Sequence, residues 1–234
     1  IPVVCREHAI HDLVPVDLMD TRQTLRTALE RIRQEQVDSC WFDGGGSLPP
    51  EWTTCGDADY AGGTVLGGAH RIVLEGDRAA VWSAVRSIGG KNGWYFAQGL
   101  WRLRGMMDRL AGGPGLRRGR RDPTDLRVGD GLDFWRVIAV EPPRRLLLLA
   151  EMKAPGDALL EFIVSPQGQN IVELKMVSRF LPRGLAGILY WTVLLPTHRW
   201  LFEGMLKAVA RRTALPVRRG PERADMTPSL ECRL

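Results

Sequence analysis

The sequence contains little cysteine and histidine, which argues against a protein built on disulfides or metal sites. Its four cysteines include no CxxC pair, so we expect reduced thiols in a cytoplasmic protein. The four histidines lack the cysteine or carboxylate neighbours that would complete a metal site, and no metal is expected. These residues are Cys5, Cys40, Cys55, Cys232, His8, His11, His70 and His198.

Long apolar runs are missing too. The longest extends from Leu185 to Leu195, whereas a membrane-spanning helix needs roughly 18 or more apolar residues. The sequence also carries no signal-peptide pattern. We therefore expect a cytoplasmic protein without a membrane span.

The residue arrangements that mark common enzymes are absent as well. No strand–GxGxxG–helix unit occurs, which argues against a dinucleotide-binding core within this chain. No Ser–His–Asp or Cys–His arrangement is visible, and no predicted helix carries two carboxylates at short spacing. The sequence therefore assigns neither a catalytic residue nor a cofactor to this chain, and whether it is an enzyme stays open.

A basic region is present, although the net charge of the chain is only +5. The stretch GGPGLRRGRR, at 112–121, could cradle a phosphate if it preceded a helix, but it follows a predicted one. Its arginines could pair with acids of their own domain such as Asp122, Asp125 or Asp133, or contact a partner domain or its bound dinucleotide. Nucleic acid is not expected as a partner, because no aromatic residues alternate with the arginines. The candidates are Arg117, Arg118, Arg120 and Arg121.

The order of the predicted elements indicates an α+β fold. A strand at 70–76 places alternate residues on one face, and helices at 77–88 and 94–110 follow it. The second of these helices has an apolar stripe formed by Leu100, Leu103, Met107 and Leu110. Four strand-like runs at 131–141, 145–153, 158–164 and 169–180 have short connections and must therefore be antiparallel. A long apolar helix at 183–212, kinked by Pro196, is the natural cover for one face of this sheet.

The chain divides into four predicted parts. Residues 1–42 contain a short amphipathic helix that begins at Asp20 or Thr21, and residues 43–64 form a linker rich in Gly, Pro, Asp and Thr. The α+β domain covers 65–215. The last part, 216–234, has no hydrophobic period and is expected to be a flexible tail.

Four segments carry a resemblance to a known family. NGWYFAQGLWRLRGMMDRLAGGPGLRRGRR (92–121), VGDGLDFWRV (128–137), LLAEMKAPG (148–156) and PRGLAGILYWTVLLPTHRWLFEGM (182–205) resemble the DUF2867 family, of the SRPBCC (START/Bet v1-like) superfamily. The resemblance covers roughly residues 65–212. It implies a helix-grip fold, in which a curved antiparallel sheet wraps a long C-terminal helix around a cavity for apolar ligands. The chain departs from the family pattern at PGDALL (155–160), where an aromatic residue is expected after the turn.

The resemblance also implies a partner domain. DUF2867 domains often follow an NmrA-like or epimerase-like Rossmann domain of the extended short-chain dehydrogenase type. VVCREHAIHDLVP (3–15) and TLRTALERIR (24–33) resemble the end of that domain, so residues 1–42 are interpreted as its remnant. NAD(P) would then bind the missing Rossmann domain and not this chain.

Candidate pocket residues come from the aromatic helices and from two strands. The aromatic residues of 94–101 and 190–200 could line a ligand pocket or fill the core. In DFWR (133–136), strand alternation would place Asp133 and Trp135 on one face, and Arg136 would need Glu151 or Glu161 as its partner. The candidates are Trp94, Tyr95, Trp101, Trp135, Arg136, Glu151, Tyr190, Trp191 and His198.

Three functions follow from these candidates. The favoured one is a module that holds a small apolar or amphipathic molecule between the sheet and the long helix. The second is a cyclase- or isomerase-type enzyme that uses Glu151 or Arg136. The third is an interaction or regulatory domain that docks on the Rossmann partner through the basic loop.

Overall fold

The computed structural model describes residues 19–34, 64–117 and 120–226. The chain separates into two compact units, Ile1–Val37 and Asp38–Leu234. Helix α2 (Thr21–Gln34) is the described element of the first unit. The Asp20 carboxylate accepts the N–H of Gln23, and the Gln23 side chain accepts the N–H of Asp20, so Asp20 caps this helix as predicted. The predicted linker, 43–64, lies almost entirely outside the described residues.

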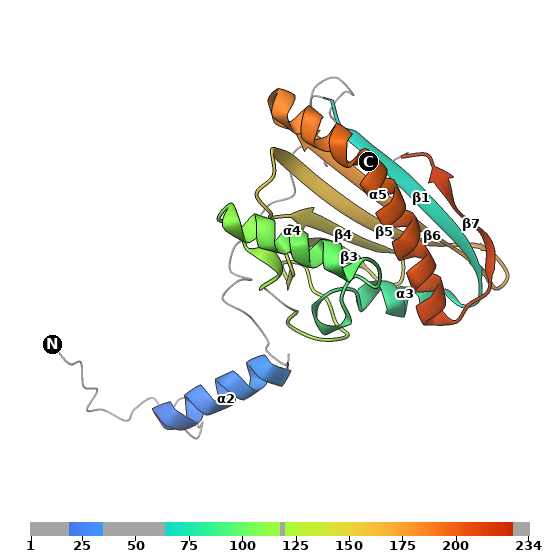
Figure 1. Ribbon diagram of the computed structural model, residues 1–234. Coiled ribbons are helices and arrows are strands. Elements are labelled where there is room, and N and C mark those ends of the chain that lie inside the picture. Colours follow the sequence, from blue (N-terminus) through green and yellow to red (C-terminus); the bar gives the residue numbers. More distant parts are fainter. Residues whose placement is uncertain (1–18, 35–63, 118–119, 227–234) are drawn as a thin grey trace, which may run out of the picture. The chain divides into compact units, whose positions relative to one another are not determined.

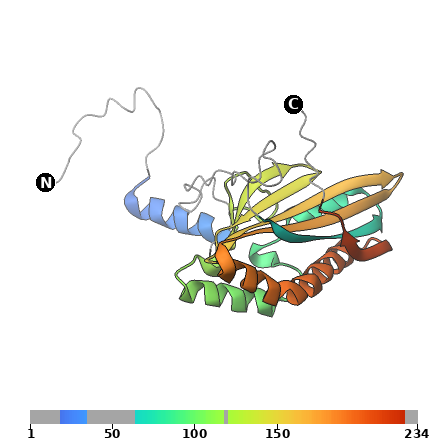
Figure 2. The same cartoon turned by 90° about the horizontal axis from the view of Figure 1, so that it is seen from above.

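The second unit is a seven-stranded antiparallel sheet with its helices on one face (Figures 1 and 2). The strand order is β2-β3-β4-β5-β6-β1-β7. Helix α5 crosses the sheet as the long C-terminal cover, so the molecule has the predicted α+β helix-grip fold. The strands are β1 (Leu66–Glu75), β2 (Gly131–Leu132), β3 (Trp135–Glu141), β4 (Arg145–Ala150), β5 (Gly156–Gly168), β6 (Ile171–Pro182) and β7 (Val217–Ala224). The helices are α3 (Arg78–Arg86), α4 (Gln98–Leu110) and α5 (Gly184–Thr213), with short 3-10 turns η3 (Gly90–Asn92) and η4 (Gly115–Arg117).

The main core lies between the sheet and the helices. Ile72 and Leu74 of β1 are fully buried there, as the alternation of the first strand predicts. Leu146 and Leu148 of β4 join the same core, whereas Leu147 and Leu149 belong to a separate buried cluster. Since successive residues of a strand point to opposite faces, β4 is buried on both of its faces, which explains its unbroken apolar sequence.

A group of aromatic rings closes one end of this core. Trp94 is almost completely buried, and its ring lies near those of Trp101, Phe134 and Trp135, with centroids 5.0, 6.4 and 6.0 Å away. The Trp94 indole N–H donates to a carboxylate oxygen of Asp133 at 2.8 Å. Burial raises the pKa of Asp133 from 3.8 to about 6, against the opposing effects of hydrogen bonds from Trp94 and Gly90.

The predicted alternation across DFWR is wrong. Asp133 and Phe134 form a turn between β2 and β3 instead of continuing a strand, and Asp133 has a positive φ of 55°. All four residues of the motif, Asp133 to Arg136, are buried. The left-handed turn, which Asp tolerates better than most residues, brings the carboxylate to the Trp94 N–H.

The predicted flexible tail also needs correction, because residues 217–224 form strand β7. This strand pairs with β1, whose other edge is taken by β6. The β1 residue Arg71 links the three strands through Glu173 at 3.3 Å and Glu222 at 2.8 Å. The charged residues, Gly and Pro of this segment are those that proteins use on a sheet edge, and the same composition is typical of a flexible tail.

The apolar stripe predicted on α4 lies on the outside of the molecule. The residues of α4 that are buried are Trp101, Gly105 and Asp108. The Asp108 carboxylate accepts the N–H of Gly115 at 2.8 Å and the N–H of Lys153 at 2.6 Å. Helix α4 is therefore held partly by buried hydrogen bonds, and its apolar stripe stays free.

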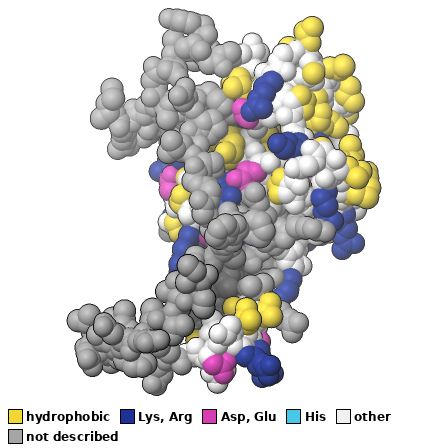
Figure 3. Space-filling view, turned by 90° about the vertical axis from the view of Figure 1, so that its left-hand side faces the viewer, with side chains coloured by type: hydrophobic (Ala, Val, Ile, Leu, Met, Phe, Trp, Pro, Cys, Tyr) yellow, Lys and Arg dark blue, Asp and Glu magenta, His cyan; other side chains and the backbone are white. Residues whose placement is uncertain are grey.

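Exposed apolar side chains continue from α4 onto α5. We refer to this set as the helical apolar face. Figure 3 shows hydrophobic side chains gathered along its right-hand edge, which is the side that faces the viewer in Figure 1. The face comprises Leu100, Leu103, Met106, Met107 and Leu110 of α4, and Leu185, Ile188, Leu189, Val193, Leu195 and Trp200 of α5.

Alternate residues of β5 point away from the helices, and Glu161 among them is only 1% exposed. Its carboxylate accepts hydrogen bonds from Arg145 at 2.6 Å and from Arg179 at 2.8 Å. Two guanidinium groups thus compensate one buried carboxylate, and Arg145 has a second, exposed partner in Glu141.

Replacing Glu161 by Gln should destabilise the protein by about 3 kcal/mol or more, because two arginines then keep their charges without a buried counter-charge. The free energy of unfolding in urea, measured at neutral pH, tests this. Glu141→Gln is the matched control: it removes an exposed partner of the same Arg145 and should change that energy by less than about 1 kcal/mol. Equal effects of the two substitutions would contradict the assignment.

Replacing Asp133 by Asn should remove one pH dependence of stability. The pKa of Asp133 is higher in the folded protein, about 6, than its ordinary 3.8, so folding favours the neutral acid. The stability that Asp133 contributes is therefore full below about pH 4 and falls as the pH rises through about 6. The difference in unfolding free energy between Asp133→Asn and the parent should grow by about 2–3 kcal/mol across that window. A difference independent of pH would refute the raised pKa.

Candidate functional site

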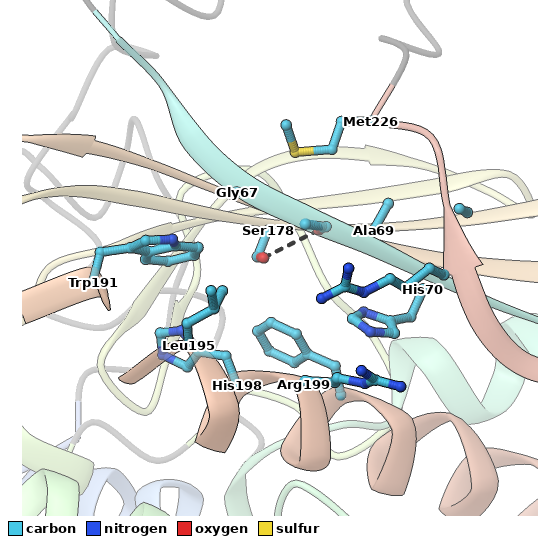
Figure 4. A pocket seen from close by; sticks show the side chains of 13 residues that line it. Gly67, Ala69, His70, Ser178, Trp191, Leu195, His198, Arg199 and Met226 are labelled. Carbon is cyan, nitrogen blue, oxygen red and sulfur yellow. Dashed lines mark hydrogen bonds between the residues drawn. The ribbon is translucent and has the colours of Figure 1, made fainter. Parts of the chain in front are cut away.

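A pocket of about 380 Å³ lies between α5 and the sheet. Strands β1, β6 and β7 form its roof and one side, and side chains of α5 face them from below (Figure 4). It lies in the place that the helix-grip resemblance predicts for a cavity. The lining residues are Gly67, Gly68, Ala69, His70, Ser178, Trp191, Leu195, His198, Arg199, Phe202, Arg223, Ala224 and Met226.

Glycine on β1 keeps the roof of the pocket open. A Cβ atom added at Gly68 would meet no atom within 4 Å, so this strand position presents empty space. The Ser178 hydroxyl on β6 donates to the Gly68 carbonyl at 3.2 Å and fixes the strand there. The hollow therefore follows from the absence of a side chain at one position of the strand.

Helix α5 spans the pocket between two close contacts. A Cβ at Gly187 would collide with the backbone at Pro155 and with Pro182, and one at Gly204 would collide with the ring of Phe96. Glycine thus lets the helix approach its neighbours on both sides of the pocket. The pocket-lining residues of α5 lie between these two positions.

The floor of the pocket is a row of rings on one face of α5. Trp191, His198 and Phe202 follow helical spacing, with centroid distances of 4.8 Å from Trp191 to His198 and 5.6 Å from His198 to Phe202. The His70 ring, from β1, lies 6.2 Å from that of Phe202. The row offers a flat apolar ligand an extended aromatic surface.

Both histidines of the pocket have buried nitrogens without hydrogen-bond partners among the described residues. These atoms are Nδ1 of His198 and both ring nitrogens of His70. Burial lowers the pKa of His198 to about 4, with a smaller contribution from the charge of Arg104. Burial also lowers the pKa of His70, although Glu203, at 3.9 Å from Nε2, opposes the shift. Both rings are therefore neutral at pH 7 and retain unused hydrogen-bonding capacity.

Of the nine predicted pocket residues, the structure places Trp191 and His198 in the pocket lining. Trp94, Trp101 and Trp135 belong to the core instead. They fill it because the turn at Asp133 and the start of α4 close on each other at that end of the sheet.

Tyr95 and Tyr190 do not line the pocket either. The Tyr95 hydroxyl donates to the Ala84 carbonyl at 2.9 Å, and the Arg212 guanidinium lies over its ring. Arg104 of α4 lies over the ring of Tyr190, 5.3 Å from its centroid. Each tyrosine thus joins elements of the helical layer.

Arg136 pairs with Glu151, which is one of the two partners that the sequence predicted for it. The ion pair measures 3.0 Å, and Arg136 also donates to the carbonyl of Gly129 at 2.7 Å. Neither side chain belongs to the pocket lining, so the pair does not present a charge to a ligand there. The other candidate partner, Glu161, is occupied by Arg145.

The described arginines of the basic loop fold inward onto their own domain. Arg121 is buried and pairs with Asp130 at 3.0 Å. Arg120 is buried too and donates to backbone carbonyls, among them that of Ile88 at 2.7 Å. Neither is available to a partner domain, which corrects their assignment as partner-contact residues. The side chain of Arg117 and the whole of Arg118 lie outside the described residues.

Sequence reasoning missed several pocket residues, chiefly Gly68, His70 and Phe202. A usable signal was present, because His70 lies on the inward face of a predicted strand two residues after a glycine pair. Phe202 follows His198 by one helical turn and so shares its face. Arg199, Arg223 and Met226 gave no such signal.

Two further findings concern metals and membranes. Within the described ranges, no three side chains of His, Cys, Asp or Glu come together as metal ligands. Among the helices that the structure describes, none is both long enough and apolar enough to cross a membrane.

Solved structures resemble this chain only distantly. An HSP90 activator from Plasmodium falciparum has 14% identity and a TM-score of 0.38, over 67% of this chain and 100% of its own. The ZhuI aromatase/cyclase from Streptomyces sp. R1128 has 14% identity and a TM-score of 0.37, over 64% of this chain and 94% of its own. Norcoclaurine synthase from Thalictrum flavum has 10% identity and a TM-score of 0.38, over 71% of this chain and 97% of its own. At these scores the likenesses say nothing about a ligand or a reaction in this chain.

The comparisons of sequence give one match. Comparison with curated proteins finds none. The model of DUF2867, described as a protein of unknown function, matches residues 60–205, which is more than half of the chain and includes strands β1 to β6 and α5 as far as residue 205. The chain therefore belongs to the DUF2867 family.

Proposed function

We propose that this domain binds a small, amphipathic and largely flat molecule in the pocket between α5 and the sheet. The observation that carries the proposal is the combination of an aromatic floor with unpaired, buried imidazole nitrogens. Buried polar atoms normally have a hydrogen-bond partner, since leaving one unpaired costs about 1–3 kcal/mol. A ligand with a hydroxyl, carbonyl or amine group would supply that partner while its apolar part covers the rings.

The state of the histidines indicates which polar groups would fit. A neutral imidazole has one N–H donor and one acceptor nitrogen, so each ring can serve either kind of ligand group. A cation is less suitable, because Arg199 and Arg223 line the same pocket. The ligand class that fits best is a neutral or weakly anionic aromatic or polycyclic compound.

The pocket supports binding better than catalysis. A histidine whose pKa is about 4 is a much weaker base than one near 6.5, so His198 would take a proton from substrate inefficiently at neutral pH. Glu151 and Arg136, which the sequence suggests for a cyclase-type reaction, form an ion pair with each other and do not line the pocket. We therefore place the enzyme second.

The attachment to an NAD(P)-binding Rossmann domain stays a proposal. One segment that carries it, 3–15, lies outside the described residues, and the other forms most of α2, whose Leu25 and Leu29 are exposed. In the proposed arrangement, the apolar stripe of this amphipathic helix would pack against the Rossmann domain.

Replacing Gly68 by Phe should fill the pocket and abolish binding of a neutral fluorescent probe, 1-aminoanthracene. The ring would enter empty space instead of displacing the strand, so the thermal midpoint should be preserved. Fluorescence titration measures the binding. Gly68→Ala is the matched control, because a single methyl group leaves most of the volume and should retain binding. Probe binding that is unchanged in Gly68→Phe would reject this pocket as the site.

Replacing His198 by Phe tests the polar part of the site. Phe keeps a ring between Trp191 and Phe202 but removes the nitrogens, so the loss of one hydrogen bond should weaken 1-aminoanthracene by about fivefold. The same titration measures it. Tighter binding to the more apolar variant would show that the nitrogen does not contact the probe amine.

A further inference from the structure

The helical apolar face is too large to be an ordinary surface. Its members are 37% to 84% exposed, and they come from two helices on the same side of the sheet. On α5, Leu185, Leu189 and Val193 repeat at every fourth residue and form a stripe along the outer side. Monomeric soluble proteins rarely expose contiguous apolar areas of this kind unless something binds to them.

The two helices form one surface at this point. The Arg104 guanidinium of α4 lies over the Tyr190 ring of α5, 5.3 Å from its centroid. The ring of Phe96, just before α4, lies 4.7 Å from that of Trp200. The exposed apolar residues of α4 and α5 therefore flank a shared line of contacts.

The exposed charged residues of α4 at this face are positive, and the arginines at the two ends of the α5 stripe are paired with acids. Helix α4 has no exposed acidic residue, since Asp108 is buried, and its exposed charged residues are Arg102 and Arg109. No described acid lies within ion-pair distance of either arginine. On α5 no charged residue occurs between Arg183 and Arg199. Arg183 pairs with Asp157 at 2.7 Å and Arg199 pairs with Glu203 at 3.1 Å.

We propose that the helical apolar face binds the surface of an anionic lipid bilayer. Its apolar side chains would enter the boundary between headgroups and acyl chains, while Arg102 and Arg109 meet lipid phosphates and carboxylates. Trp200 lies where the apolar stripe gives way to charged residues, beside Arg199, a position suited to the amphipathic indole at a membrane interface. The helices lie on the bilayer and do not cross it.

A second copy of the chain is a poorer occupant for the same face. Two such faces in contact would bring arginines of one copy towards arginines of the other, with no exposed acid on α4 to compensate them. A surface that carries negative charge and accepts apolar side chains satisfies both features at once.

Membrane binding would also place the pocket close to lipid. Leu195 is both a member of the helical apolar face and a lining residue of the pocket, and Arg199 lines the pocket beside Trp200. The inference about the bilayer does not rest on the proposed ligand, because it uses the outer side of the helices. The variant Gly68→Phe should accordingly bind vesicles as the parent does.

The test is co-sedimentation of the full chain with vesicles made of equal parts of phosphatidylcholine and phosphatidylserine. We expect binding to these vesicles, weaker binding to phosphatidylcholine alone, and a loss of binding on adding salt. Val193→Glu should weaken binding by about tenfold or more, because it places a carboxylate in the apolar stripe facing anionic lipid. Leu189→Glu provides a second, independent variant on the same stripe.

Matched controls exist on the same molecule. Val128 is 66% exposed, as Val193 is, but lies in the loop before β2, so Val128→Glu should bind as the parent does. Arg102→Glu should weaken binding by about tenfold or more, whereas Arg127→Glu, near Val128, should have little effect. Thermal melting establishes that each variant is folded.

Three results would overturn the inference. The first is the absence of binding to the anionic vesicles at low salt. The second is an equal effect of Val128→Glu and Val193→Glu. The third is a dimer, seen by analytical ultracentrifugation and abolished by Val193→Glu, without vesicle binding; this would assign the face to a second copy of the chain.

Discussion

The arrangement depends on how α5 rests on its neighbours. Its second half packs into the core through residues such as Leu206 and Val209, while close contacts at Gly187 and Gly204 lie on both sides of the pocket-lining segment. Between those two glycines the helix spans the pocket and is supported at both ends. The sheet that faces this segment has no side chain at Gly68 to fill the gap, so the pocket forms between the two positions at which the helix is supported.

The same support at two points explains why this segment of α5 has a pocket on one side and solvent on the other. Trp191 and His198 face the pocket, whereas Leu189 and Val193 face outward and remain exposed. The helix is therefore apolar nearly all round without being buried all round. A helix that is apolar on all sides is expected in a protein core or a membrane. Here one side of the helix faces the pocket and the other side is exposed.

Polar contacts, more than apolar ones, place the segment between α4 and β2. Asp108 binds the N–H groups of Gly115 and Lys153, and Arg120 binds carbonyl groups, while Arg121 pairs with Asp130. These buried groups are fully engaged, and they order a stretch that has few apolar residues of its own. Arg120 and Arg121, the arginines of GGPGLRRGRR whose side chains the structure describes, therefore serve the fold.

The sequence predicted the order of elements well, since strands and helices follow from the periods of the apolar residues. It could not predict features that depend on distant parts of the chain. The stripe on α4 has a helical period whether it faces a core or not, so Leu103 and Met107 were indistinguishable from buried residues. The turn at Asp133 depends on a hydrogen bond to Trp94, and the strand at 217–224 depends on the free edge of β1. For the site, the aromatic residues of α5 could be predicted, but the empty position at Gly68 could not.

Strand β7 forms one side of the pocket, and it is a part of the sheet that can open locally. It lies at the edge of the sheet, it is bonded to β1 on one side only, and its register with β1 is irregular. Edge segments of this sort open locally at a lower free energy than the strands behind them. Because Arg223 and Ala224 belong to both the strand and the pocket, fraying of β7 would widen the pocket from the side while the core stays closed.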